Sequence, residues 1–307
     1  MISQFMYNNW CKEEKNMKEP LDRMLEKDYL YCEEVIKKHS RSFYYAFSQL
    51  PEEKAKAIYA IYAFCRRADD TVDMAPTAAQ QRKNLDRLEH ELTLFEEDRP
   101  VDNPVWRALT DVFERYPMNI EPFYHQIKGQ RMDIDFTSPD TLADLEDYSY
   151  YVAGTVGLML LPILAKRHTQ EATESALTLG IAMQLTNILR DIGEDLKENN
   201  RVYLPNDILS QENYTIEDLK NGSITAAFIR TWELLASRSE VLYDHFKKDI
   251  HLYDPESQLP VLISANVYRG ILDAVRKSKY NCFDKRNAVS LVEMDKIRRE
   301  TKQFLKA

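Results

Sequence analysis

The chain has 307 residues, of which only seven are glycine and 44% are hydrophobic. A glycine content so far below the usual ~7% excludes a turn-rich β-sheet fold, and the many good helix formers predict an all-α protein with a substantial core. The net charge of −9 argues against nucleic-acid binding, because phosphate backbones are held by clustered Lys and Arg.

Helical patterns occupy most of the chain. Residues 1–20 are polar and irregular, so we expect a loosely ordered leader there and a single working domain over 21–307. No stretch approaches the ~20 apolar residues of a membrane span, so any membrane contact is expected to be peripheral. In chain order, we expect helices over about 22–39, 50–75, 79–97, 101–116, 120–133, 141–165, a long one through 180–199, 212–221, 224–250 and 259–280, with 289–305 closing the chain.

Cysteine usage points to a reducing compartment. The four cysteines have no CxxC spacing, which favours neither a zinc site nor a disulfide framework. We therefore expect a cytoplasmic protein. The cysteines are Cys11, Cys32, Cys65 and Cys282.

An acidic pair continues the apolar face of one predicted helix. In residues 58–73, IYAIYAFCRRADDTVD, Asp69 and Asp73 are four residues apart. They extend the stripe that begins with Ile58 and Tyr62, so these carboxylates point where the core points. Two arginines, at 66 and 67, come just before them.

A second helix repeats this design. In residues 180–205, GIAMQLTNILRDIGEDLKENNRVYLP, one narrow stripe holds Gln184, Asn187, Asp191 and Asp195, and Arg190 precedes the acidic pair. Short amides and carboxylates without the Lys and Glu of a solvated face are typical of a ligand surface. Carboxylates one turn apart also repel, which a cation between them would relieve.

The two motifs together predict a paired metal and diphosphate site. Carboxylate oxygens at this spacing suit Mg²⁺, which typically bridges one or two carboxylates to substrate phosphates, and the arginines suit the phosphates. Either motif alone would be interpreted as an ordinary acidic helix face. The repetition favours the functional interpretation.

Small residues interrupt the predicted helix over 141–165. In DYSYYVAGTVGLMLLPIL, Ala153, Gly154 and Gly157 lie mid-helix, where a glycine costs about 1 kcal/mol. Close helix packing explains them, and so does a smooth channel for a long apolar ligand. The sequence leaves both explanations open.

At these motifs the chain resembles the squalene/phytoene synthases, which join two prenyl diphosphates head to head. The resemblance runs from about residue 39 to residue 286. It rests on HSRSF, RRADDTVD, YSYYVAGTVGLMLLPI and the 180–205 segment, in that order. It implies a class I isoprenoid synthase fold, a single-domain helical bundle around a central apolar cavity.

The resemblance also implies roles for individual residues. A basic residue near the C-terminus is expected at the site, for which Lys285 and Arg286 compete. Tyr148 corresponds to a tyrosine near the reacting carbons, and Arg66 belongs with it to the implied catalytic residues. Gln184 corresponds to a residue that lines the cavity. Two or three Mg²⁺ ions would be held by Asp69, Asp73, Asn187, Asp191 and Asp195, and the diphosphates by His39, Ser40, Ser42, Arg66, Arg190 and Tyr268.

Among the members, the chain resembles most the bacterial dehydrosqualene (4,4'-diapophytoene) synthases of C30 carotenoid pathways. The implied substrate is farnesyl diphosphate and the implied intermediate presqualene diphosphate. The alternatives are phytoene synthase, which uses geranylgeranyl diphosphate, and squalene synthase, which uses NADPH. No glycine-rich dinucleotide loop is present, so no NADPH is expected.

Aromatic bulk bears on the substrate length. Phe43 and Phe47 share one face of the HSRSF segment, with Tyr59 on the next helix, and such bulk in an apolar tunnel favours C15 over C20 chains. The ring of Tyr62 is explained equally by core packing and by stabilisation of a carbocation.

Two other classes of protein fit parts of the pattern. Terpene cyclases and chain-elongating prenyl synthases also use paired acidic helices and Mg²⁺, but they leave the YVAGTVG segment unexplained. A non-catalytic relative acting as an assembly factor would not need both acidic pairs, and here both are intact.

Overall fold

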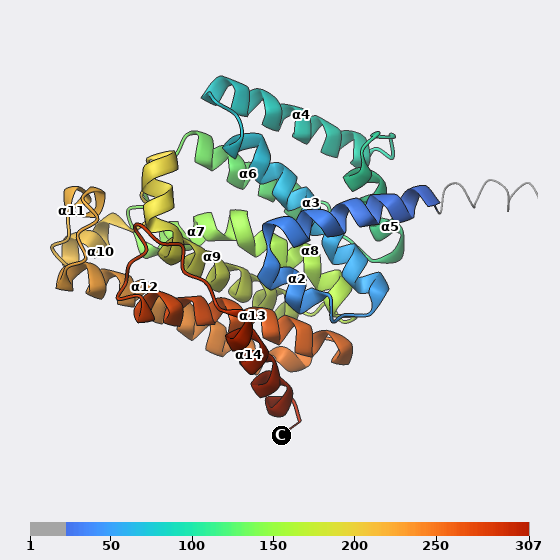
Figure 1. Ribbon diagram of the computed structural model, residues 1–307. Helices are drawn as coiled ribbons and strands as arrows, with labels where there is room; N and C mark the ends of the chain where they lie inside the picture. The colour runs from blue at the N-terminus through green and yellow to red at the C-terminus, as the bar shows by residue number, and fades with distance from the viewer. Residues whose placement is uncertain (1–22, 307) are drawn as a thin grey trace, which may run out of the picture.

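The computed structural model describes residues 23–306, and within them every regular element is a helix (Figure 1). The predicted all-α fold is confirmed, whereas the predicted leader, 1–20, lies outside the described residues. No helix of the described part is long and apolar enough to cross a membrane. After a helix over residues 23–39, the elements are α2 (Arg41–Phe47), α3 (Glu52–Asp73), α4 (Ala78–Glu96), α5 (Pro104–Arg115), α6 (Glu121–Ile134), α7 (Leu142–Ser149), η1 (Tyr150–Gly154), α8 (Thr155–Leu164), α9 (Gln170–Asn199), α10 (Asn206–Gln211), α11 (Ile216–Lys220), α12 (Ala226–Lys248), η2 (Ile250–Leu252), α13 (Pro255–Lys277) and α14 (Leu291–Phe304).

The longest helix, α9, lies at the centre of the bundle and packs against α7, η1, α8, α12 and α13 (Figure 1). It begins where the Thr169 side chain accepts a hydrogen bond from the Ala172 N–H, and it ends at Asn200, whose φ of 51° is left-handed. A side-chain cap of this kind satisfies an N–H group that the first turn would otherwise leave unpaired. The helix carries the second acidic pair in its last third.

Helix α3 carries the first acidic pair in its last turn. It packs against α4, α5, α6 and α8, and its buried face is largely alanine and aliphatic residues. Glu52 and Glu53 lie in its first turn, where negative charge favours helix formation. Because the polar ends of α3 and α9 both border one cavity, the two acidic pairs face a common space.

The segment predicted as one helix over 141–165 is broken into three pieces. A capping box between Thr141 and Asp144 starts α7, and the π-helical turn η1 separates α7 from α8. Glycines on the neighbouring helices let the backbone of η1 approach closely. A Cβ at Gly129 would lie 3.0 Å from the Tyr151 carbonyl carbon, and a Cβ at Gly180 would lie 2.5 Å from the Ala153 carbonyl oxygen.

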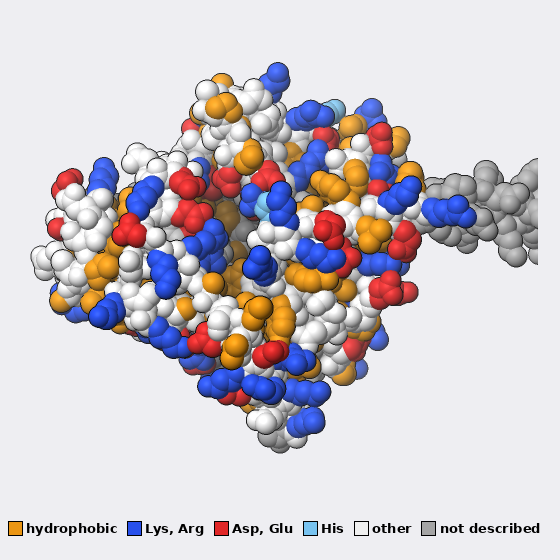
Figure 2. Space-filling model, in the orientation of Figure 1, with side chains coloured by type: hydrophobic (Ala, Val, Ile, Leu, Met, Phe, Trp, Pro, Cys, Tyr) orange, Lys and Arg blue, Asp and Glu red, His pale blue; other side chains and the backbone are white. Residues whose placement is uncertain are grey.

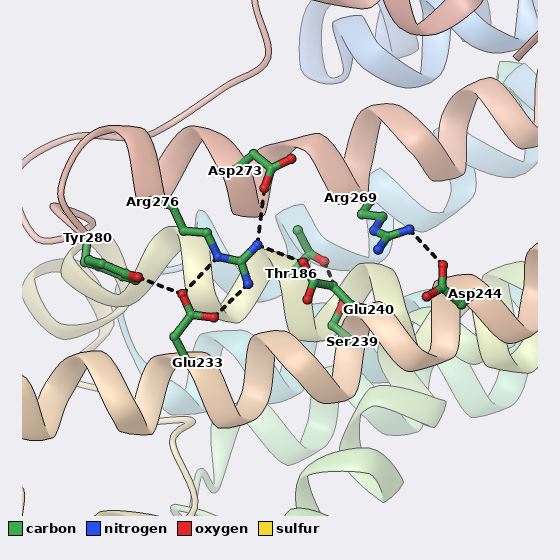
Figure 3. Close-up of polar contacts among 9 residues, drawn as sticks. All are labelled: Thr186, Glu233, Ser239, Glu240, Asp244, Arg269, Asp273, Arg276 and Tyr280. Atoms are coloured by element: carbon green, nitrogen blue, oxygen red, sulfur yellow. Dashed lines mark hydrogen bonds and ion pairs between the residues drawn. The ribbon is translucent and has the colours of Figure 1, made fainter. Parts of the chain in front are cut away.

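Polar contacts join α13 to α12 along the outer side of the bundle (Figure 3). Arg276 on α13 donates to both carboxylate oxygens of Glu233 at 2.9 and 2.7 Å and to Glu240 at 2.7 Å. On the inner side of α12, Ser239 meets Thr186 of α9 at 3.1 Å. The Arg276 contacts thus join α13 to α12, and the Ser239–Thr186 contact joins α12 to α9.

Several predicted helix boundaries were wrong. Helix α10 was missed, although Pro205 directly precedes it, and the helix expected over 212–221 spans only Ile216–Lys220. Helix α13 begins at Pro255, not near 259, because Pro is favoured in a first helical turn. The closing segment is helical over Leu291–Phe304, with a capping box between Ser290 and Glu293.

Candidate active site

A cavity of about 880 Å³ lies between α2, α3, α6, η1, α8, α9 and α13. Figure 2 shows this face of the molecule hollowed near its centre, with hydrophobic side chains inside the hollow and Lys and Arg side chains at its rim. The site residues that the sequence predicted all line this cavity. They are His39, Ser40, Ser42, Phe43, Phe47, Tyr62, Arg66, Asp69, Asp73, Tyr148, Gln184, Asn187, Arg190, Asp191, Asp195 and Tyr268.

The first acidic pair lies at one side of the cavity, with Asp69 partly buried and Asp73 more exposed to solvent. Burial and the neighbouring Asp73 carboxylate raise the pKa of Asp69 to about 7. Partial desolvation by the cavity wall also raises the pKa of Asp73, although this side chain is more exposed and Arg66 and Arg201 oppose the shift. The only hydrogen bond to Asp69 that the described residues supply comes from Gln130 Nε2, at 2.7 Å. This pair therefore carries more negative charge than its surroundings neutralise.

The second acidic pair has one paired and one poorly compensated carboxylate. Asp191 accepts from Arg190, with a distance of 2.7 Å from Nε to Oδ1. Burial, together with Asp191 and Glu194, raises the pKa of Asp195 to about 8. The negative charge of Asp191 is thus balanced by Arg190, whereas the charge of Asp195 has no comparably close cation in the described part of the chain.

These features fit a divalent cation that also binds the substrate. In the described residues, no three His, Cys, Asp or Glu side chains lie close enough together to hold a metal alone. The carboxylates of Asp69 and Asp195 have raised pKa values, and the buried Asn187 Oδ1 has no hydrogen-bond partner among residues 23–306. Mg²⁺ commonly takes one or two carboxylates and completes its shell with water and substrate phosphate oxygens. The donor set present suits that arrangement.

Positive groups lie beside the acidic pairs. The buried Arg66 Nε has no partner within the described part of the chain, and so it is available to an anionic ligand. Partial desolvation and the nearby Arg66 cation lower the pKa of His39. The Ser40 hydroxyl caps α2 by accepting from the Phe43 N–H at 3.4 Å.

The apolar end of the cavity is walled by aromatic rings. Phe43 and Phe47 stack with their centroids 5.6 Å apart, and Phe43 also contacts Tyr268 at 5.2 Å and Tyr62 at 6.3 Å. Tyr62 thus borders the cavity and does not only fill the core. Tyr59, expected to add bulk here, does not line the cavity; it packs against Tyr44 at 5.9 Å.

The small residues of η1 and α8 permit close helix packing, and two of them also line the cavity. Gly157 lines the cavity, and a Cβ there would lie 2.4 Å from the Ala176 carbonyl oxygen, so this glycine also permits close packing against α9. Ala153 lines the cavity as well. Gly154 does not, and its role is packing, since a Cβ there would be 3.2 Å from Leu177 Cδ2.

The structure separates the two basic candidates near the C-terminus. Arg286 lines the cavity and pairs with Glu194 at 3.1 Å and with Asp191 at 3.5 Å. Lys285 is exposed and does not line the cavity. Arg286 is therefore the residue placed to meet a ligand.

Sequence reasoning missed a buried polar group on the cavity wall, made of Asp133, Tyr203 and Arg201. Tyr148 and Tyr203 both donate to Asp133 Oδ1, at 3.1 and 3.0 Å. Arg201 Nη1 lies 3.6 Å from Asp133 Oδ2. Asp133 lies near the end of a predicted helix and the other two residues in a predicted loop, and only the fold brings them to Tyr148.

Comparisons with known proteins identify the family of this chain. The squalene/phytoene synthase family model matches residues 36–293. Over 286 residues the chain is 38% identical to 4,4'-diapophytoene synthase from Staphylococcus haemolyticus (strain JCSC1435), covering 92% of this chain and 99% of that protein. It is 39% identical over 263 residues to chloroplastic phytoene synthase 2 from Zea mays, covering 84% of this chain and 65% of that protein. The crystal structure of a dehydrosqualene synthase in complex with ligand has a TM-score of 0.88 and 43% identity, covering 93% of this chain and 99% of that one.

Proposed function

Because the chain belongs to the squalene/phytoene synthase family, whose members are prenyltransferase-type enzymes with an all-α isoprenoid synthase fold, we propose that it is a dehydrosqualene (4,4'-diapophytoene) synthase. The observation that carries this proposal is the Phe43–Phe47 stack at the apolar end of the cavity. It limits the length of the prenyl chain and so favours two C15 substrates over two C20 substrates. The prenyl synthase domain would span residues 21–307.

The polar end of the cavity would bind two farnesyl diphosphates. Arg66 and Arg190 would hold diphosphate oxygens, aided by His39, Ser40 and Ser42. Asp69, Asp73, Asn187, Asp191 and Asp195 would hold Mg²⁺, which supplies positive charge that stabilises the departing diphosphate. Arg286 would close the anion site from the C-terminal segment.

The apolar end would direct the carbon chemistry. Loss of diphosphate from one farnesyl group gives an allylic cation, and the C2=C3 bond of the second farnesyl group attacks it. Loss of a proton closes the cyclopropane of presqualene diphosphate. A second loss of diphosphate, rearrangement and loss of a proton give dehydrosqualene. The rings of Tyr62, Tyr148 and Tyr268 would stabilise the cations by ~0.5–2 kcal/mol each.

Phytoene synthase is the second candidate. The identity to the maize phytoene synthase, 39%, is as high as the identity to the staphylococcal diapophytoene synthase, 38%. Overall similarity therefore does not choose between C20 and C15 substrates. The reductive squalene synthase remains the third candidate, and for the non-reductive enzyme no NADPH is required.

The experiment is product analysis with purified protein, Mg²⁺ and one substrate at a time. Farnesyl diphosphate is expected to give a C30 hydrocarbon with the ultraviolet spectrum of a conjugated triene, with or without NADPH. Squalene formed only with NADPH would instead identify the reductive enzyme. A C40 triene from geranylgeranyl diphosphate, with no C30 product, would identify a phytoene synthase. No product from either substrate would overturn the proposal.

The product would leave through an apolar rim. Leu291, which lines the cavity, is 73% exposed, and its neighbour Val292 is 77% exposed. Beyond them the outer face of α14 carries Lys296, Arg299 and Lys302, all exposed. Exposed apolar residues followed by cations suit a peripheral contact with an anionic lipid surface. We place the protein in the cytoplasm, with α14 against the membrane.

A further inference from the structure

A buried carboxylate sits behind the tyrosine that the family resemblance places near the reacting carbons. Asp133, from the end of α6, lines the cavity and accepts the Tyr148 hydroxyl at 3.1 Å from Oδ1 and 3.3 Å from Oδ2. The Tyr203 hydroxyl donates to Oδ1 at 3.0 Å. Two phenols therefore share one carboxylate at the cavity wall.

Arg201 completes this group and fixes the direction of its hydrogen bonds. Its Nη2 donates to the Asp133 carbonyl oxygen at 2.7 Å, and its Nη1 donates to the Tyr203 hydroxyl oxygen at 3.4 Å. Because Tyr203 accepts from the guanidinium, its single proton goes to the carboxylate. Arg201 also lies 3.6 Å from Asp133 Oδ2 and compensates the buried charge. The Tyr148 hydroxyl also lies 3.4 Å from the Tyr203 hydroxyl oxygen, but the Asp133 carboxylate, at 3.1 Å, is its nearer acceptor.

This arrangement determines what Tyr148 presents to a ligand. A phenol has one proton, and when that proton is held by a carboxylate, the oxygen lone pairs and the ring face remain for the cavity. Burial and the adjacent Asp133 carboxylate raise the pKa of Tyr148, so the phenol stays neutral. The rings of Tyr148 and Tyr203 pack 5.2 Å apart, which restricts rotation of both. A carbocation near Tyr148 would meet an electron-rich but uncharged group.

We propose that Asp133 is a positioning residue that fixes Tyr148 as a hydrogen-bond donor, so that its ring and oxygen lone pairs face the carbocation formed in the condensation. The proposal rests on the proposed function of this site. Without the carboxylate, the Tyr148 hydroxyl is free to turn its proton towards the cavity, where it opposes a positive charge. Loss of the Asp133 carboxylate should therefore slow the steps that pass through a carbocation, and it should leave binding of the diphosphates unchanged.

The test is a double-mutant cycle with Asp133→Asn and Tyr148→Phe, using whichever prenyl diphosphate the wild type converts. Asp133→Asn is expected to lower kcat about tenfold or more, to change KM less than about threefold, and to have almost no further effect in the Tyr148→Phe background. The matched control is Asp135→Asn, because Asp135 lies two residues further on, is exposed and pairs with Arg82. We expect it to leave kcat unchanged.

Two outcomes contradict the proposal. Additive losses in the double variant, or a rise in KM without a change in kcat, would mean that Asp133 acts on the ligand or the fold and not through Tyr148. If the Asp133→Asn variant does not fold, Tyr203→Phe is used in its place, because this change removes one donor to Oδ1 and keeps the carboxylate. Tyr203→Phe is also expected to slow turnover only in a background in which Tyr148 keeps its hydroxyl. A wild type that converts neither prenyl diphosphate would overturn the proposed function and this proposal together, whereas a C40 product would overturn only the C15 assignment.

Discussion

Gly193, between the two aspartates of the second acidic pair, lies directly against the backbone of Phe283. Its N–H donates to the Cys282 carbonyl oxygen at 3.0 Å, and a Cβ at this position would be 2.0 Å from the Phe283 carbonyl oxygen. This contact fixes the C-terminal segment that carries Arg286 over the end of α9. Only glycine allows two backbones to approach so closely.

We therefore expect Gly193→Ala to lower both stability and activity. The added methyl group must displace the backbone of the C-terminal segment, and overpacking of this kind typically costs ~1–3 kcal/mol. Denaturant unfolding would measure the loss of free energy of unfolding, and a steady-state assay the loss of activity. Gly270→Ala is the matched control, because a Cβ there would meet only side-chain atoms, at 3.1 and 3.5 Å. Equal effects of the two substitutions would show that the Gly193 contact has no special importance.

Replacement of Arg286 tests whether the C-terminal segment contributes to binding of the ligand. It pairs with Glu194 and Asp191 at the edge of the cavity, while its side chain remains 58% exposed and able to reach a ligand. We expect Arg286→Ala to raise KM for the prenyl diphosphate about tenfold, equivalent to ~1.4 kcal/mol of binding free energy. Lys285→Ala, a neighbouring change of the same charge, should leave KM within about twofold. The reverse order of effects would reassign the basic position to Lys285.

The sequence predicted the part of the site that local spacing controls. Asp69 and Asp73, like Asp191 and Asp195, are one helical turn apart, and that spacing alone puts each pair on one face. The apolar residues on the same face of α3 direct its pair inward. That the two pairs border one cavity was inferred from the repeated motif, and the structure brings them together there.

Non-local contacts were beyond this reasoning. Asp133, Arg201 and Tyr203 come from the end of one helix and a loop, without a shared motif, and the fold alone joins them to Tyr148. Gly193 and Phe283 are ninety positions apart in the sequence, so their approach depends on the folded arrangement of the chain between them. The π-helical turn η1 was missed for a similar reason, since neighbouring glycines on α6 and α9 make room for it.

The buried carboxylates predict a pH dependence of stability. An unfolded aspartate titrates near 3.9, whereas burial raises the pKa of Asp69 to about 7 and of Asp195 to about 8. The folded protein thus holds these protons more tightly, and the stability they contribute is complete below about 4 and is lost as pH rises through 7 to 8. We expect the Tm of metal-free protein to fall over this range.

The matched variants are Asp69→Asn and Asp195→Asn. Each should remove up to about 1.4 kcal/mol per pH unit from the slope of unfolding free energy between about pH 4 and the folded pKa, because it removes one titrating proton. Mg²⁺ with inorganic pyrophosphate should also flatten the wild-type profile, since a cation stabilises the ionised carboxylates. A wild-type slope equal to that of both variants would contradict the raised pKa values.

The outer face of α14 predicts binding to anionic lipid. Lys296, Arg299 and Lys302 follow the exposed Val292 along this face, and no carboxylate of the described residues pairs with Arg299 or Lys302. Vesicles of phosphatidylglycerol should therefore bind the protein, and vesicles of phosphatidylcholine should bind it weakly. Since each basic residue near such a surface contributes about 1 kcal/mol, reversing these three charges to Glu should reduce the bound fraction at least about tenfold.

The control for lipid binding carries the same change in net charge elsewhere. Lys83 on α4, Lys166 after α8 and Lys220 on α11 are all exposed, and Figure 1 places α4 at the opposite end of the molecule from α14. Their replacement by Glu should leave most of the binding intact. Equal losses in the two triple variants would show that only net charge matters and that α14 is not the contact.

The stack of Phe43 and Phe47 leads to a prediction about chain length. Phe47 is buried against Phe43 at 5.6 Å and lines the apolar end of the cavity, so its ring occupies space into which a longer prenyl chain would extend. Removing the ring should open this end, and Phe47→Ala is expected to lower stability by ~3–5 kcal/mol through the cavity it creates. We expect the ratio of activity on geranylgeranyl diphosphate to activity on farnesyl diphosphate to rise about tenfold or more, because the longer prenyl chain would bury its additional apolar carbons in the space that the ring leaves.

Tyr59→Ala is the matched control, because Tyr59 is equally buried but does not line the cavity. It should lower stability without changing the ratio of the two activities. An unchanged ratio of activities for Phe47→Ala would mean that the Phe43–Phe47 stack does not limit the length of the prenyl chain.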